Sequence, residues 1–304
     1  MKNILVIGGT GFLGSAIVRE LARRPASADS CFTLPTRREA GARHLTVLPT
    51  ARVVEADVHD PATLARLVKG QDAVISLVGI LKGGEGEPYG AGFARAHVEL
   101  PQKIAVAAKA AGVRRLLHVS ALRAATDAPS GYLRSKAAGE EALQAAGLDL
   151  TIFRPSVIFG RGDSFLTLFA KMAKIAPFFP LAGADARFQP IWVEDVAAVV
   201  ADSLENSQSI GMAYDLCGPK QYALAELVRY ATAASGHPRA VFGIPEFVGW
   251  LQAWAMEFIP NGPMTRDNIR SMRVPSVCDA GCGLPFGRPA TALENIAPTY
   301  LGDG

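Results

Sequence analysis

The chain has 304 residues, about two domains' worth, with 49% hydrophobic and 19% charged residues and a formal net charge of +3. This composition excludes a disordered chain, because ample apolar surface is present to offset the ordering entropy. Its 30 Gly and 20 Pro follow no repeat, which excludes collagen-like and low-complexity classes. A net charge of only +3 gives no indication of nucleic-acid binding. The mean hydropathy of +0.19 is high for a soluble protein.

The apolar character does not come from a membrane-spanning segment. No run of about 18 apolar residues occurs, so we expect no transmembrane helix. The uncharged stretch Ile4–Val18 is interrupted by four glycines and lacks a cleavage site, so we expect a strand and turn there rather than a signal peptide. The four cysteines are scattered, with no partners for zinc, and we expect reduced, buried thiols in a cytoplasmic protein.

The first half of the chain alternates between short β-rich segments and segments of helical period. The predicted strands are Asn3–Ile7, Cys31–Thr36, Arg52–Ala56, Ala73–Leu77, Arg115–Val119 and Leu150–Phe153. The predicted helices are Phe12–Arg23, Pro61–Val68, Phe93–Ala111 and Leu133–Ala146. Gly70, Gly112 and Gly147 follow three of these helices, where C-terminal caps belong. The alternation predicts an α/β fold with a doubly wound, Rossmann-type parallel sheet.

The second half is less regular. After Arg154 the alternation loosens and prolines become frequent. We expect a dinucleotide-binding domain over residues 1–155, to which sheet elements from about 188–217 return. Residues 156–187 and 218–304 then form a smaller C-terminal substrate domain.

The most informative local pattern is a glycine-rich loop between the first strand and the first helix. Its sequence is Gly8-Gly9-Thr10-Gly11-Phe12-Leu13-Gly14. Gly8 permits a tight turn, Gly11 lets the backbone approach a pyrophosphate, and Gly14 lets helix and strand pack closely. A helix N-terminus also binds phosphate through its free N–H groups. The loop predicts a dinucleotide site.

The end of the second predicted strand indicates which dinucleotide is bound. An NAD site usually carries an acidic residue there, whereas this chain has Thr36-Arg37-Arg38. Guanidinium groups bind a 2′-phosphate by charge-assisted hydrogen bonds, so NADP(H) is favoured over NAD(H), unless the two arginines are simply solvated. Asp57 and Val58 follow the third strand, where a carboxylate can accept from the adenine amino group.

Several segments together resemble the extended and atypical short-chain dehydrogenases/reductases, the epimerase/dehydratase group. They are the glycine loop, ADVHD, LVGI, HVSA, YLRSK, FRPSVIFGRGD and FQPIWVEDVA. The segment from Met264 to Val277 is similar to a bacterial branch related to an NADPH-binding accessory subunit of respiratory complex I. The resemblance implies a Rossmann fold and extends the cofactor site to residues beyond the loop, namely Leu77, Val78, Gly79, Ser120, Pro155 and Val157.

The resemblance also places the catalytic centre at a Tyr-x-x-x-Lys pair, matched by Tyr132 and Lys136. These residues share a helix face, and the ammonium is expected to lower the pKa of a tyrosine general acid/base. The register leaves two positions open. The helper hydroxyl comes from Ser120, or it is lost because Ala121 stands at its place. His97 either relays protons or has a structural role.

Two apolar stretches of the second half, Phe165–Gly183 and Val241–Pro263, each have more than one possible role. One helical face carries Phe165, Leu168, Phe169, Met172, Ile175 and Ala176. It either packs within its own domain or lines an apolar pocket. Phe247, Trp250, Leu251 and Trp254 have the same two interpretations, with contact to lipid headgroups as a third. Arg266, Arg270 and Arg273 form either an anion-facing stripe or a solvated face.

Three functional hypotheses follow from the sequence. The first is an NADP(H)-dependent oxidoreductase or epimerase/dehydratase-like enzyme acting on a small or apolar carbonyl or alcohol, quinones included, with no metal. The second is a non-catalytic NADP(H)-holding accessory or assembly protein of the complex I type. The third is an NADP redox sensor. In each case we expect a cytoplasmic protein, with contact to a respiratory complex or to the inner face of a membrane left open.

Overall fold

The fold is built around one parallel sheet, as the alternation predicts. A computed structural model describes residues 1–25, 28–259, 262, 264–279 and 282–302. Seven strands pair in the order β11-β6-β5-β4-β1-β2-β3, and every pairing is parallel. Their bounds are β1 Asn3–Ile7, β2 Cys31–Thr36, β3 Ala51–Glu55, β4 Ala73–Ser76, β5 Arg115–Val119, β6 Asp149–Pro155 and β11 Ala213–Leu216. The order reverses between β1 and β4, and ligands of such sheets bind at the carboxyl ends of the strands at this point.

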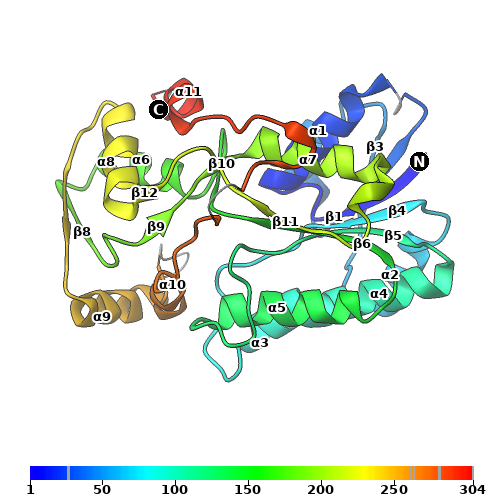
Figure 1. Ribbon diagram of the computed structural model, residues 1–304, viewed down its shortest axis with the longest axis horizontal. Coiled ribbons are helices and arrows are strands. Elements are labelled where there is room, and N and C mark those ends of the chain that lie inside the picture. The colour runs from blue at the N-terminus through cyan, green and yellow to red at the C-terminus, as the bar shows by residue number, and fades with distance from the viewer. Residues whose placement is uncertain (26–27, 260–261, 263, 280–281, 303–304) are drawn as a thin grey trace.

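Helices cover both faces of the sheet. On one face α1 (Phe12–Arg23) packs against α7 (Val193–Glu205), and on the other α4 (Leu100–Ala111) packs between α2 (Pro61–Val68) and α5 (Gly131–Gln144) (Figure 1). Each layer closes over its own cluster of buried aliphatic side chains. Much of the high mean hydropathy is therefore accounted for, since strands covered on both faces read as continuous apolar runs.

A second group of elements lies beside the carboxyl edge of the sheet, at the left of Figure 1. Its helices are α6 Leu166–Ala173, α8 Leu224–Ala234, α9 Glu246–Glu257 and α10 Arg266–Ser271, followed by α11 Leu293–Ile296 and α12 Pro298–Leu301. Short strands pair two by two: β7 Ile158–Phe159 with β10 Ile191–Trp192, β9 Arg187–Phe188 with β12 Tyr222–Ala223, and β8 Phe178–Leu181 with β13 Ala240–Gly243. The assignment of this group to a separate substrate domain stays a prediction.

Most predicted elements agree with the structure to within one or two residues, and one helix differs in kind. Gly70, Gly112 and Gly147 all adopt the left-handed conformation expected after a helix. The helix predicted over Phe93–Ala111 is divided into α3 (Ala91–Phe93), a π-helical segment (η3, Ala94–Glu99) and α4. Such wide turns are rare and occur mostly at functional sites.

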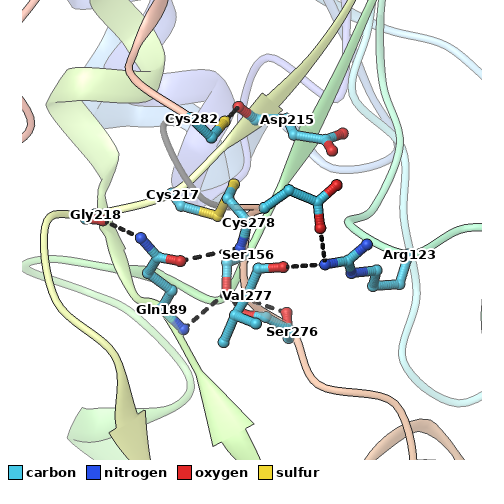
Figure 2. The surroundings of a disulfide bond; sticks show 11 residues. Arg123, Ser156, Gln189, Asp215, Cys217, Gly218, Ser276, Val277, Cys278 and Cys282 are labelled. Carbon is cyan, nitrogen blue, oxygen red and sulfur yellow. Dashed lines mark hydrogen bonds and ion pairs between the residues drawn. A yellow bond between two sulfur atoms is a disulfide. The ribbon is translucent and has the colours of Figure 1, made fainter.

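The prediction of four reduced thiols is wrong. A disulfide joins Cys217 to Cys278, and Cys282 is exposed rather than buried. Cys217 follows β11, and the segment that carries Cys278 runs alongside β9, where the Ser276 N–H donates to the Arg187 carbonyl (2.8 Å). Figure 2 shows this segment held further by Gln189, whose side-chain oxygen accepts from the Cys278 N–H (3.0 Å). Separation along the sequence therefore concealed the proximity of the two cysteines.

The disulfide closes a loop with a sequence separation of 61 residues. Cross-linking a loop of this size removes chain entropy from the unfolded state that corresponds to about 4 kcal/mol. We expect Cys278→Ser to lower the free energy of unfolding by up to about 4 kcal/mol. Denaturant titration measures the change, with Cys31→Ser, outside the disulfide, as the control. An equal loss in the two variants would contradict the contribution of the bond.

Candidate active site

The glycine loop has the geometry of a phosphate cradle. Gly8 has a φ of +87°, a backbone conformation that favours glycine. The Gly11 N–H donates to the Gly8 carbonyl (3.1 Å) and closes the turn. A Cβ on Gly14 would lie 2.2 Å from the Gly8 oxygen, so only glycine permits α1 to approach β1 this closely. The roles predicted for Gly8 and Gly14 fit these contacts.

The first turn of α1 is open to an anion. Its N-cap residue is Gly11, which offers no side-chain cap, and the turn contains no acidic residue. The N–H groups at a helix start need acceptors, and here no capping side chain supplies one. A pyrophosphate oxygen at this position would satisfy these groups and be stabilised by the helix dipole.

The end of β4 lies next to this loop, at the point where the strand order reverses. A Cβ on Gly8 would lie 3.2 Å from the Leu77 side chain and 3.3 Å from the Val78 nitrogen. Gly79, in the same segment, approaches Lys136 of α5, since a Cβ on Gly79 would lie 3.2 Å from Lys136 Nζ. The structure thus brings the glycine loop, the β4 end and Lys136 to one edge of the sheet.

Tyr132 and Lys136 both lie on α5, which begins earlier than the sequence predicts. Ser130 caps this helix, and its Oγ accepts from the Leu133 N–H (3.2 Å). The carboxylate of Asp267, a residue of α10, accepts from the N–H groups of Gly131 (2.7 Å) and Tyr132 (3.0 Å). A carboxylate at a helix N-terminus is stabilised by the dipole, so α10 fixes the turn that carries the tyrosine.

The ring of Tyr132 is held by two other aromatic side chains. It lies edge-on to His97 (5.6 Å between centroids) and to Phe93 (6.0 Å), and Phe93 stacks on His97 (5.5 Å). Edge-to-face pairs at these distances are favourable. Within the described residues the Tyr132 hydroxyl has no hydrogen-bond partner, so it is free to bind a ligand.

The pKa of Tyr132 differs from the expectation. Burial raises it to about 12, and Lys136 does not lower it. Burial likewise lowers the pKa of Lys136 to about 8, although the nearby Glu140 carboxylate opposes the change. The expected lowering of this pKa by the ammonium is not seen, because desolvation of the phenolate dominates. Tyr132 is a protonated phenol near neutral pH and is suited to donate a proton.

Lys136 and Ser120 have unused hydrogen-bonding capacity. Lys136 is 4% exposed, and its ammonium donates to the Val119 carbonyl (3.2 Å), which leaves further donors for a ligand. Ser120 is also 4% exposed, and its Oγ has no partner among the described residues. An unpaired buried hydroxyl is costly, which fits a group that a ligand completes. Ala121 packs in the apolar cluster that also contacts Tyr132.

His97 belongs to the π-helical segment and is fully enclosed. The Ile80 N–H donates to its Nε2 (3.0 Å). Ser135 Oγ donates to the Tyr132 carbonyl (2.7 Å) and therefore accepts from His97 Nδ1 (2.8 Å). Burial, aided by the Lys136 charge, lowers the pKa of His97 to about 2. The ring is thus neutral with both nitrogens engaged, which favours a structural role.

The arginines predicted to select the cofactor lie at the end of β2. Arg37 and Arg38 are exposed, and neither side chain has a hydrogen-bond or ion-pair partner among the described residues. The Ala56 N–H donates to the Thr36 carbonyl (2.8 Å), which places Asp57 and Val58 beside them. Asp57 Oδ1 accepts from the His59 N–H (2.9 Å) in its own turn.

The predicted cofactor residues Pro155 and Val157 lie at and just beyond the end of β6. The Pro155 carbonyl accepts from the Leu122 N–H (3.1 Å), and the Val157 carbonyl accepts from the Ile191 N–H (3.0 Å).

Among the described residues no group of three or more His, Cys, Asp or Glu side chains is arranged to hold a metal ion. No helix in the described ranges has the length and apolarity needed to cross a membrane.

The arginine stripe predicted near the C-terminus is occupied by partners within the chain. Arg266 pairs with Glu257 (2.8 Å), Arg270 with Glu85 (3.0 Å) and Arg273 with Glu246. These pairs replace the anion-facing stripe by internal ion pairs. The role of Asp267 was not predicted. Its sequence neighbourhood gives no sign that its carboxylate caps the start of another helix, α5.

Comparison with known proteins places the chain among nucleotide-binding proteins. The family described as NAD(P)H-binding matches residues 8–207. Subunit 9 of the NADH dehydrogenase [ubiquinone] 1 alpha subcomplex, a mitochondrial protein, is 30% identical in Mus musculus over 302 residues, which are 97% of this chain and 76% of that protein. A protein named ceramide reductase from Caulobacter vibrioides is 35% identical over 198 residues, 64% of this chain and 58% of that one.

A solved structure shows the same fold over nearly the whole chain. It is an NADPH-dependent quinone oxidoreductase from Escherichia coli in complex with NADPH, with a TM-score of 0.77, 23% identity and coverage of 98% of this chain and 99% of that one. The chain spans 65% of the length of the Rattus norvegicus subunit 9, to which it is 32% identical over 249 residues, 81% of this chain. The chain belongs to the NAD(P)H-binding family, and it is a relative of subunit 9 of the mitochondrial NADH dehydrogenase 1 alpha subcomplex.

Proposed function

We propose that this protein is an NADP(H)-dependent reductase of an apolar carbonyl compound. The observation that carries the proposal is the convergence of an uncapped helix start, a buried lysine with free donors and a protonated tyrosine at one edge of the sheet. A protein that only holds a nucleotide needs the first two groups. It has no need of a half-buried phenol with a free hydroxyl.

Each residue has a defined task in this proposal. The loop from Gly8 to Gly14 and the first turn of α1 bind the pyrophosphate. Lys136 donates to the nicotinamide ribose. The cofactor, when bound, supplies a hydride. Tyr132 donates a proton to the carbonyl oxygen, and Ser120 donates a hydrogen bond to the same oxygen.

The raised pKa of Tyr132 favours one direction of reaction. A phenol with a pKa of about 12 stays protonated at pH 7 and serves as an acid in reduction. Oxidation of an alcohol requires the phenolate, whose formation the positive charge of an oxidised nicotinamide would assist. We therefore propose that Tyr132 acts as the acid of a reduction. The Phe93 ring packed against Tyr132 favours quinones and long-chain ketones over charged substrates.

A second function is favoured by the relatives. Subunit 9 is named as part of a mitochondrial NADH dehydrogenase, so an NADP(H)-holding accessory or assembly role without turnover is the alternative. An NADP redox sensor would use the same binding groups. In either case we propose contact with a respiratory complex or with the face of a membrane.

The cofactor preference is tested by charge reversal at the two arginines. We expect Arg37→Glu/Arg38→Glu to weaken NADPH binding at least tenfold, because the carboxylates repel the 2′-phosphate, and to leave NADH binding unchanged. Fluorescence titration with both cofactors measures this. Arg66→Glu, an exposed arginine of α2, is the control and should bind NADPH as the wild type does. Equal wild-type affinity for NADPH and NADH would rule out the preference.

The role of the tyrosine is tested by removing its hydroxyl. Tyr132→Phe keeps the ring contacts to Phe93 and His97, so the fold and NADPH affinity should persist. We expect loss of a general acid to lower kcat by about 10²–10⁴ on any quinone or ketone that the wild type reduces. If the wild type oxidises bound NADPH with no member of a panel of quinones, long-chain ketones and nucleotide sugars, the accessory role replaces the enzyme.

His97 provides a pH test that separates a structural role from a proton relay. Its pKa is about 2 in the folded protein and 6.5 when exposed, so below pH 6.5 the unfolded chain takes up a proton that the folded one does not. The free energy of unfolding should therefore fall by up to about 1.4 kcal/mol per pH unit for this group as the pH drops below 6.5.

We expect His97→Asn to show a shallower decline between pH 6.5 and 5 in urea denaturation. His118→Asn is the comparison, because burial lowers its pKa to about 3 and the same decrease in slope should follow. The pH profile of kcat should keep its shape in His97→Asn. Loss of a titrating limb from that profile would instead support a proton relay.

A further inference from the structure

Helix α9 presents its large apolar side chains to solvent and its small ones to the protein. The outward face carries Phe247 (76% exposed), Trp250 (40%), Leu251 (60%) and Trp254 (43%), and the C-cap residue Phe258 (72%) continues the same helical stripe. The inward face is made of Gly249 and Ala253, the buried residues of this helix. This is the reverse of an ordinary surface helix, whose large apolar stripe faces the core.

The inward contact is too close for the helix to be turned over. A Cβ on Gly249 would lie 2.4 Å from the Cβ of Ala182, and Ala253 packs with Ala182 and Ile269. Only small residues fit between α9 and the body of the protein, so the aromatic stripe is held outward by packing. A fixed stripe of five large apolar side chains marks an interaction surface.

The charges of α9 are already satisfied within the chain. Glu246 pairs with Arg273, and Glu257 forms a two-pronged pair with Arg266, whose guanidinium also stacks on the Trp250 ring (5.0 Å). Neither glutamate is therefore left to repel an anionic surface. The two tryptophans add indole N–H groups to an apolar body, the combination found where one end of a side chain is apolar and the other wet.

The segments that lead into β8 and α9 carry further aromatic rings and exposed cations. The strand pair β8–β13 leads into α9, and Phe178 (51% exposed) and Phe242 (47%) of this pair contact each other at 5.8 Å. Between Ser164 and Ala184 the charged residues are Lys171 and Lys174, both exposed, and the stretch contains no acid. A stretch that combines exposed apolar rings with a net positive charge complements an anionic lipid headgroup layer above an acyl layer.

We propose that α9 is a membrane-docking helix, whose outward stripe of Phe247, Trp250, Leu251, Trp254 and Phe258 enters the headgroup boundary of an anionic bilayer. The helix lies at the outer edge of the molecule, below the β8–β13 pair in Figure 1, where a flat surface can reach it. Burial of the stripe holds the protein on the bilayer, and the net positive charge of the stretch between Ser164 and Ala184 favours anionic headgroups.

Helix α9 is connected to the Tyr132 end of α5 through α10. α9 packs on α10, and Asp267 of α10 accepts from the backbone N–H groups of Gly131 and Tyr132. Docking by α9 would therefore hold the Tyr132 end of α5 near the bilayer, where an apolar carbonyl substrate resides. This substrate delivery rests on the proposed reductase function, whereas the docking itself does not.

Vesicle flotation tests the docking surface with the full chain. We expect the wild type to float with phosphatidylcholine vesicles containing a quarter phosphatidylglycerol, with a blue shift of tryptophan emission, and to bind pure phosphatidylcholine more weakly. Phe247→Glu/Leu251→Glu should reduce binding at least tenfold. Both side chains are more than half exposed and outside the cofactor site, so folding and NADPH binding should be unchanged.

The matched control places two glutamates elsewhere. Val47 (77% exposed) and Val106 (69%) are exposed apolar residues outside α9, and Val47→Glu/Val106→Glu should float as the wild type does. Equal flotation of the α9 variant and the wild type, or no flotation of the wild type at low salt, would overturn the proposal. So would a concentration-dependent dimer that the α9 variant abolishes, because a second copy would then cover the stripe. Flotation without turnover would leave docking intact and refute the reductase.

Discussion

The approach of α1 to β1 is the contact on which the site depends. A Cβ on Gly14 would lie 2.2 Å from the Gly8 backbone oxygen, so the helix can start where the strand ends only if Gly14 lacks a side chain. This brings the open helix terminus to the point where the strand order reverses. Strands β4, β5 and β6 then deliver Gly79, Ser120 and Pro155 to the same edge, because parallel strands share one carboxyl end.

The C-terminal part of the chain completes this edge. Asp267 secures the start of α5, and the segment around Ser276 is bonded to Ser156 and Gln189 beside the ends of β6 and β11. The tyrosine is thus placed by elements from both halves of the sequence. Its ring is fixed by Phe93 and a neutral His97, and its backbone by an aspartate more than a hundred residues away.

The sequence predicted the sheet well because each strand and helix carries its own periodicity and cap. The strands β1, β2 and β5 agree to the residue, and the glycine loop could be assigned from its position between β1 and α1. What failed depended on distant neighbours. The Cys217–Cys278 pairing, the cap by Asp267, the pairing of the three arginines with glutamates and the raised pKa of Tyr132 arise from tertiary contact or burial. The π-helical segment carries no composition signal that sets it apart from an ordinary helix.

The disulfide also has a topological consequence. Cys217 directly follows the last strand of the sheet, and Cys278 follows the last helix that contacts α5, so α8, β13, α9 and α10 all lie within one covalently closed loop. A backbone cut anywhere inside this loop leaves both pieces attached to the sheet. The part of the chain that carries the aromatic stripe is therefore tethered at both of its ends, and it stays attached to the sheet even when its own strands and helices open.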